Sequence, residues 1–246
     1  MHRFFISPDR IEDGTVTLPT NVAHQLTRVL RRQPGDGIVV LDGTGWEYDV
    51  TLTTVGSREA LGSVTDGRIA AGEPRTAIIL YQALLKADRF ELVLQKGTEL
   101  GVSRFVPVVC TRSVAKESPG GSRTARRRKI IVEAAEQSRR GVIPGLDEPV
   151  SFVAACDAME GPAVIPWEEE EATGLRTVLS RWKAEGLGAR LSLLVGPEGG
   201  FTAEEVAHAR SRGIEPVTLG SRILRAETAS IAAVSATLYE LGDLGG

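Results

Sequence analysis

The chain has 246 residues, of which 42% are hydrophobic and 25% charged, which fits one large soluble domain or two small ones. No apolar stretch approaches the roughly 20 residues that span a bilayer, and the N-terminus has no signal-like apolar core. The two cysteines, Cys110 and Cys156, lack metal-ligand spacing. These features disfavour a membrane protein, a disulfide scaffold or a zinc site, and we expect a protein of the reducing cytoplasm.

Charge is distributed unevenly along the chain, although the net charge is only −3. Residues 111–140 hold nine Lys or Arg against three Asp or Glu, whereas residues 141–246 hold eight against sixteen. A positive segment of this kind attracts polyanions even on an acidic protein. A solvated helix face is the alternative interpretation of the same residues.

Residues 1–72 predict a small β-barrel. Short alternating runs such as "GIVVLDG" and "EYDVTLTTV" are separated by turn clusters. One helix interrupts them at 21–32, with Asn21 as its cap and an apolar stripe of Val22, Leu26, Val29 and Leu30. Gly and Pro in "AAGEPRTA" then mark a linker to a second domain, residues 73–246.

The second domain predicts an α/β fold with a parallel sheet. Continuous apolar strands are expected at 76–84, 104–110, 161–167, 190–196 and 214–220. Helical patterns alternate with them, including 88–102, closed by Gly101, and 126–140, ended by Gly141. Strands that alternate with helices indicate a parallel sheet covered on both faces.

Three strand ends carry polar or glycine-rich stretches, and ligands of such sheets bind at the carboxyl ends of the strands. They are "VIPWEEE" with Trp167 and Glu168, "LLVGPEGGFTAEEV", and "VTLGSRILRAETASIAAV". In the second, Thr202 and Glu205 predict a capping box. No Lys-Ser/Thr pair follows the glycines, so the stretch is not a Walker loop. A tight turn with a surface glutamate is its plain alternative.

The third stretch places charges of both signs between a strand and an apolar helix, at Arg222, Arg225, Glu227 and Thr228. Two charged loops at adjacent strand ends would form a cleft. Such a cleft suits a ligand with an amino-acid head and a cationic centre, and S-adenosylmethionine is such a ligand.

"LLVGPEGGFTAEEV" followed by "LGSRILRAETA" closely resembles the RsmE family of SPOUT methyltransferases, which methylate N3 of uridine 1498 in 16S ribosomal RNA. "HQLTRVLRRQPGDGIVVLDGTG", "LLKADRFELVLQKGTELGV" and "EAAEQSRRGVIP" extend the resemblance along the chain. It implies an N-terminal RNA-binding barrel of PUA type, a deep trefoil knot, a homodimer and S-adenosylmethionine as cofactor. By position it also implies the cofactor residues Trp167, Leu194, Gly196, Pro197, Glu198, Gly199, Gly200, Leu219, Gly220, Ile223, Leu224 and Arg225.

The resemblance places two candidate catalytic residues beside the methyl group. Arg225 would offset negative charge on O2 or O4 of the uracil, and Glu198 would orient the arginine or the sulfonium end of the cofactor. RNA contacts are expected from Arg3, Arg28, Arg31, Arg32, Arg112, Arg123, Arg126, Arg127, Arg128 and Lys129. Further residues of family-like motifs, each with an equal structural explanation, are Lys86, Lys96, Glu99, Glu136, Gln137 and Arg140.

Two positions depart from the family pattern. Arg127 stands where the family commonly has tryptophan, and Arg139 stands where it commonly has glycine. Both put local packing and RNA contact in doubt more than the chemistry. Three rival functions remain: a non-catalytic RNA-binding homologue, a SPOUT enzyme for another base or a ribose, and a nucleotide hydrolase, which the missing Lys-Ser/Thr opposes.

Overall fold

The computed structural model describes residues 1–114, 122–159 and 161–245, and the chain divides into two compact units. The first unit comprises Met1–Glu73 and Ala135–Ile143, and the second comprises Pro74–Ala134 and Pro144–Gly246. The split after Glu73 lies one residue from the expected domain boundary. The sequence did not indicate that the distant segment Ala135–Ile143 would join the first unit.

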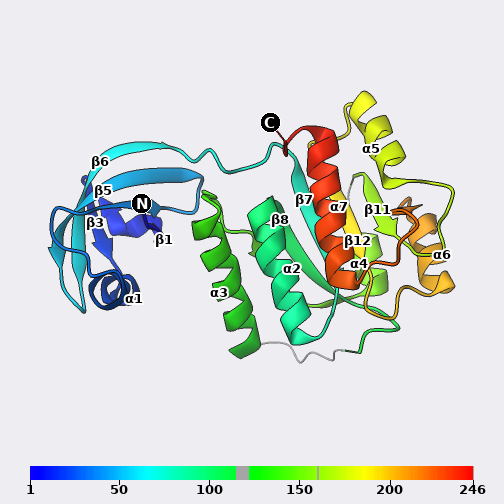
Figure 1. Ribbon diagram of the computed structural model, residues 1–246, viewed down its shortest axis with the longest axis horizontal. Coiled ribbons are helices and arrows are strands. Elements are labelled where there is room, and N and C mark those ends of the chain that lie inside the picture. The colour runs from blue at the N-terminus through cyan, green and yellow to red at the C-terminus, as the bar shows by residue number, and fades with distance from the viewer. Residues whose placement is uncertain (115–121, 160, 246) are drawn as a thin grey trace. The chain divides into compact units, whose positions relative to one another are not determined.

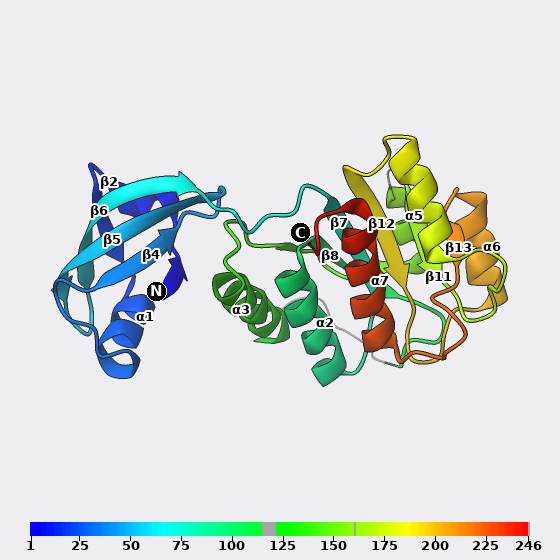
Figure 2. The same ribbon diagram turned by 45° about the horizontal axis from the view of Figure 1, so that its top comes forward.

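The first unit is built on a six-stranded sheet with the order β1-β4-β5-β6-β3-β2 (Figure 2). Its strands are β1 (Arg3–Phe5), β2 (Ile11–Glu12), β3 (Thr15–Leu18), β4 (Gly37–Leu41), β5 (Trp46–Val55) and β6 (Ala60–Ile69). β1 pairs with β4 in parallel and the other pairs are antiparallel. Alternating apolar residues, among them Phe4, Ile38 and Leu52, form one buried core.

The helix expected at 21–32 is shorter than predicted. An α-helix, α1 (Thr20–His24), continues directly into one π-helical turn, η2 (Gln25–Val29). Pro19 rather than Asn21 occupies the N-cap position, so the predicted cap is wrong. Val29 is exposed although Leu26 is buried, because the wider π turn rotates later residues off the apolar stripe.

The second unit contains a parallel sheet with the order β10-β8-β7-β12-β11-β13, and β9 pairs with β8 (Figure 1). The strands are β7 (Ala77–Ala83), β8 (Val102–Val109), β9 (Gly145–Leu146), β10 (Val150–Ser151), β11 (Ala163–Pro166), β12 (Arg190–Val195) and β13 (Glu215–Val217). Every pairing in this sheet is parallel, which confirms the predicted α/β class.

Helices cover both faces of the parallel sheet. They are α2 (Ala87–Leu100), α3 (Ser122–Gln137), α4 (Phe152–Ala158), α5 (Leu175–Ala184), α6 (Ala203–Ser211) and α7 (Ala226–Leu241). Ile78 and Leu80 of β7 pack in one core with α2, α5 and α7. Ile79 and Tyr81 alternate to the other face, where they pack with α4 and α6. None of the helices in the described residues is long and apolar enough to span a membrane.

Helix α3 ends in a way that the sequence misassigned. The N–H of Arg140 donates to the carbonyl of Ala135 at 3.0 Å, and Arg139 takes the left-handed conformation with φ of 64°. The residue that ends the helix is therefore Arg139 and not Gly141. A side chain at Gly141 would instead collide with Ala70 and with the backbone of Gly45.

The segment after α3 is fixed to the linker by the carboxylate of Glu73. Its Oε1 accepts hydrogen bonds from the backbone N–H groups of Gly141, at 3.0 Å, and Val142, at 3.2 Å. The guanidinium of Arg140 donates to both carboxylate oxygens and its side chain is only 3% exposed. A buried arginine and two successive amides thus hold one carboxylate within the first unit.

Candidate functional site

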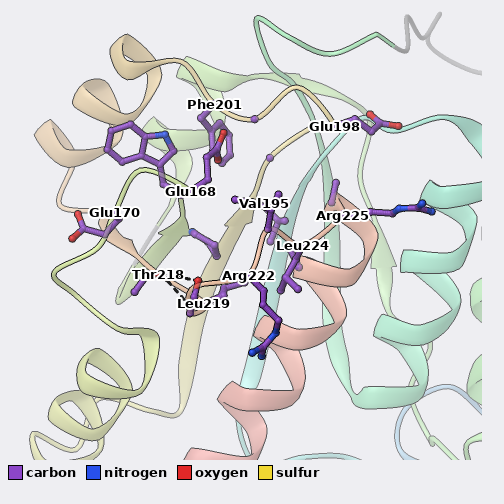
Figure 3. A pocket seen from close by; sticks show the side chains of 18 of the residues that line it. Glu168, Glu170, Val195, Glu198, Phe201, Thr218, Leu219, Arg222, Leu224 and Arg225 are labelled. Carbon is purple, nitrogen blue, oxygen red and sulfur yellow. Dashed lines mark hydrogen bonds between the residues drawn. The ribbon is translucent and has the colours of Figure 1, made fainter.

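A cavity of about 950 Å³ lies in the second unit, where the loops after β11, β12 and β13 converge (Figure 3). These strands are neighbours in the order β12-β11-β13, so their carboxyl ends meet at one edge of the sheet. The start of α2 adds Arg89 to the wall. Apolar side chains such as Val195, Leu219 and Leu224 line the cavity together with charged groups of both signs.

Most of the predicted cofactor residues line this cavity. They are Trp167, Gly196, Pro197, Glu198, Gly200, Leu219, Gly220, Ile223, Leu224 and Arg225. The other two lie elsewhere, because Leu194 is fully buried in the core under α4 and α6, and Gly199 is exposed beside Arg112. Two of these loops were expected to form a cleft, and all three, which the family resemblance named as cofactor loops, line one cavity.

The glycine-rich loop is held at both ends. Thr202 Oγ1 accepts from the N–H of Glu205 at 3.2 Å, and Glu205 Oε2 accepts from the N–H of Thr202 at 3.0 Å, which confirms the predicted capping box. Gly200 has φ of 69°, and a Cβ there would overlap the Glu168 carboxylate. Glycine at this position therefore keeps the loop against the acidic loop after β11.

Arg112 is part of the site's framework. Its Nη1 donates to the carbonyl oxygens of Gly199, at 3.0 Å, and Phe201, at 3.3 Å. We predicted Arg112 as an RNA contact, but its guanidinium is engaged with the backbone of the glycine-rich loop. The residue holds that loop from outside the cavity.

Glu198 contacts α2. Its Oε1 accepts from the N–H of Lys86 and from Arg89 Nη1, each at 3.4 Å. Arg89 Nε lies 3.9 Å from Oε1 of Glu227, which is 8% exposed, so one guanidinium bridges two carboxylates. Glu198 was predicted to orient Arg225 or the sulfonium end of the cofactor, and the side-chain partner observed is Arg89. Sequence reasoning missed Arg89, although its position just after the end of β7, next to β12, was an available signal.

Arg225 and Arg222 differ from Arg89. Arg225 is the N-cap residue of α7, both arginines are exposed, and neither side chain has a hydrogen bond or ion pair among the described residues. Figure 3 shows the side chains of Glu198 and Arg225 extending to the same side of the cavity, opposite Glu170 and Thr218. This side of the cavity therefore carries the unpaired positive charge of Arg225 as well as the paired charge of Arg89.

The opposite wall is formed by the loop after β11. Trp167 donates its backbone N–H to the carbonyl of Val217 at 3.0 Å, and its indole Nε1 is buried with no partner in the part of the chain that the structure describes. Glu170 accepts from the N–H groups of Ala172 and Thr173, both at 3.0 Å, and pairs with Arg210 at 2.9 Å. The loop is thereby fixed, and its indole N–H remains available for an acceptor.

The predicted RNA residues of the first unit are not equivalent. Arg3 pairs with the buried carboxylate of Glu47, so its charge is compensated. Arg32 lies 3.7 Å from Asp36, whereas Arg28 and Arg31 are exposed. Arg28 and Arg31 are therefore the better candidates for phosphate contact.

The basic run of α3 is divided by the helix. Arg123, Arg126, Arg128 and Lys129 are exposed, and Arg126 pairs with Glu91 at 2.8 Å. Arg127 is only 5% exposed, and its guanidinium lies 4.2 Å from the centre of the Phe90 ring. Arg127 was predicted as an RNA contact, but its guanidinium is buried against Phe90 and does not face the solvent.

The other motif residues have structural partners or lie on the surface. Lys96 pairs with Glu99 at 2.8 Å, Glu136 accepts from the N–H of Phe5 at 3.0 Å, and Gln137 is exposed. Lys86 takes part through its backbone N–H, and Arg140 through Glu73. Lys86, Lys96, Glu99, Glu136 and Arg140 thus each have a structural contact.

Among the described residues, no three His, Cys, Asp or Glu side chains are grouped so that they could hold a metal ion. Burial raises the pKa of the Cys156 thiol to about 11 and also raises the pKa of Cys110. Both thiols are therefore protonated at neutral pH and poorly nucleophilic.

The chain is similar in sequence to RNA methyltransferases. Residues 72–238 match the model of the RNA methyltransferase domain family. The chain is 35% identical to ribosomal RNA small subunit methyltransferase E of Synechocystis, over 95% of this chain and 76% of that protein. It is 32% identical to the protein of the same name in Bacillus subtilis, over 98% and 97% of the two chains.

Solved structures agree with the sequence comparison. A ribosomal RNA small subunit methyltransferase E from Neisseria gonorrhoeae, crystallised bound to S-adenosyl methionine, superposes with a TM-score of 0.86 at 31% identity over 97% of each chain. A putative methyltransferase from Legionella pneumophila in complex with the same cofactor gives 0.83 at 25% identity, again over 97% of each chain. The chain therefore belongs to the ribosomal RNA small subunit methyltransferase E family, within the RNA methyltransferases.

Proposed function

We propose that this protein transfers a methyl group from S-adenosylmethionine to N3 of a uridine in 16S ribosomal RNA, at the equivalent of position 1498. The observation that carries the proposal is the convergence of three strand-end loops on one cavity beside an unpaired arginine. The names of the relatives and the cofactor bound by two structural neighbours support it.

The residues of the cavity fit this cofactor. Val195, Leu219 and Leu224 offer an apolar surface to a purine ring, and the glycines let the backbone come close to it. The indole Nε1 of Trp167 and the Oε2 of Glu198 are buried polar atoms without a partner among the described residues, so each can take one ligand group. Leu194 and Gly199 would act from behind the wall.

The methyl group is what the cofactor supplies, and the chain's own contribution is positioning and charge. N3 of uracil is a poor nucleophile until its proton leaves, and the negative charge then spreads to O2 and O4. The exposed guanidinium of Arg225 would stabilise that charge. Glu198 would retain Arg89 and face the positive end of the cofactor.

The RNA would be held by the exposed arginines. Arg28 and Arg31 of the first unit and Arg123, Arg128 and Lys129 of α3 offer phosphate contacts, which give affinity rather than sequence reading. The target uridine would be splayed out of its stack to enter the cavity. From the same family resemblance, we propose that the first unit is a PUA-like barrel and that the second unit contains a trefoil knot. We also propose that the protein is a homodimer located in the cytoplasm.

The test is transfer of tritium from labelled S-adenosylmethionine to 30S subunits that lack their own uridine-N3 methylation, with nucleosides identified by mass spectrometry. We expect 3-methyluridine with the wild type and a loss of about 100-fold with Arg225→Ala. Label in a different nucleoside would instead mark an enzyme for another base or a ribose. Cofactor binding without any transfer to ribosomal or transfer RNA would indicate a non-catalytic homologue.

A further inference from the structure

Three arginines line the cavity, and they differ in their electrostatic partners. Arg89 touches two carboxylates, whereas Arg222 and Arg225 have no ion pair among the described residues. Four glutamates line the same cavity. One of them, Glu170, forms an ion pair with Arg210, which leaves three other carboxylates in the cavity wall. The free charge of Arg225 is therefore not the result of a lack of carboxylates nearby.

The two carboxylates that Arg89 holds are both poorly solvated. Glu227 is 8% exposed and the side chain of Glu198 is 20% exposed. In each, the second oxygen, Oε2, is buried and has no hydrogen-bond partner in the described part of the chain. A buried carboxylate without a cation is costly, so these two groups depend on the nearest guanidinium.

Arg225 is the guanidinium that could replace Arg89. It lines the cavity with Glu198, and the two side chains extend to the same side of it (Figure 3). It also precedes Glu227 by two residues, but residues at that spacing do not face each other on a helix. Glu198 is thus the carboxylate that would turn to Arg225 if Arg89 lost its charge.

We propose that Arg89 is a positioning residue that keeps Arg225 unpaired. By holding Glu198 and Glu227, Arg89 prevents Glu198 from neutralising the arginine that faces the acceptor base. This inference rests on the proposed function, because an unpaired Arg225 matters only if negative charge develops next to it. Arg225 is also the N-cap residue of α7, so the positive end of the helix dipole adds to the positive charge that would attract an anion there.

The experiment is a set of variants assayed by single-turnover methyl transfer at saturating cofactor and 30S subunits. Arg89→Gln removes the charge, Arg89→Lys keeps it, and Arg89→Gln/Glu198→Gln removes the charge together with its carboxylate. We expect Arg89→Gln to lose between about 10-fold and about 100-fold, never more than Arg225→Ala. Arg89→Lys should lose less than about fivefold, and the double variant should recover to within about fivefold of Glu198→Gln.

The recovery separates this role from a purely structural one. Two substitutions that merely weaken packing add their costs, so the proposal is overturned if Arg89→Gln slows Glu198→Gln by the same factor by which it slows the wild type. A wild-type rate for Arg89→Gln would also overturn it. Arg176→Gln in α5, whose side chain is 89% exposed, is the matched control and should leave the rate unchanged.

A crystal structure of Arg89→Gln gives a readout that does not depend on catalysis. We expect a Glu198–Arg225 ion pair with an N–O distance below about 4 Å; two separated side chains would contradict the proposal. If Arg89→Gln does not fold, Arg89→Met, which also removes the charge, takes its place in both measurements. Absent transfer by the wild type would refute the proposed function, whereas the ion pair in the variant tests the inference alone.

Discussion

The cavity and helix α3 were both predicted as binding sites from groups of residues in the sequence. The cavity residues lie together in the structure, whereas the basic residues of α3 do not share one surface. Residues from three distant segments meet in the cavity because β11, β12 and β13 are parallel neighbours. Four consecutive basic residues of α3, in contrast, are divided between surface and core. Sheet topology gathers residues that are far apart in sequence, while each step of about 100° along a helix separates neighbours.

The largest expected effect concerns the buried member of the α3 run. Arg127→Ala removes the contact with the Phe90 ring and the packing of the arginine stem, and should lower the free energy of unfolding by about 2 kcal/mol. Urea unfolding measures this loss. The salt dependence of RNA binding should not change; a weaker dependence at unchanged stability would restore Arg127 as a phosphate contact.

The next effect tests the cavity side of the comparison. Gly200→Ala should weaken cofactor binding by about tenfold, because φ of 69° costs alanine about 1 kcal/mol and its Cβ displaces Glu168. Gly213→Ala is the control, with φ of 78° and open space around its Cβ. Calorimetric titration should find normal cofactor affinity in the control. Equal affinities in both variants would place Gly200 outside the binding wall.

A smaller gain is expected at the end of α3. Arg139→Gly should raise the free energy of unfolding by about 0.5–1 kcal/mol, since glycine adopts φ of 64° without strain. Arg139→Ala retains the strain and should stay within about 0.3 kcal/mol of the wild type. Thermal unfolding of the three proteins checks the order, and equal stability of the glycine and alanine variants would show that the conformation costs arginine nothing.

The smallest effect belongs to the exposed neighbour of Arg127. Arg128→Ala should weaken RNA binding two- to fivefold and reduce the slope of log affinity against log salt by about 1. Its stability should remain within about 0.5 kcal/mol of the wild type. Filter binding at several salt concentrations measures both quantities. An unchanged slope would mean that α3 presents no phosphate contact at this position.

Much of the fold could be predicted because its signals are local. Apolar runs predicted β7, β8 and β12, and Thr202 with Glu205 predicted the start of α6. The parallel order of the strands followed from their alternation with helices. Where the prediction was wrong, a local backbone conformation that the residue pattern does not specify decided: the π turn exposes Val29, and a left-handed arginine ends α3.

The loops of the candidate site could be predicted from the sequence, but the ion pair between Glu198 and Arg89 could not. The glycine-rich loop and the loop before α7 were chosen correctly as walls of one cavity, since both follow strands of the same sheet. The partner of Glu198 was not, because Arg89 lies more than a hundred residues away and its neighbours in sequence suggest only a helix start. Ion pairs depend on side-chain reach across elements, which residue patterns do not encode.

The carboxylate of Glu73 has a consequence for dividing the chain into pieces. A fragment cut after residue 72 would lose both this carboxylate and the Ala135–Ile143 segment that it fastens. Such a truncation would expose the side chain of Ala70 and the loop at Gly45, which Gly141 covers. The first unit is thus compact in space but is made of two separate stretches of the chain. Moving it into another protein requires both stretches.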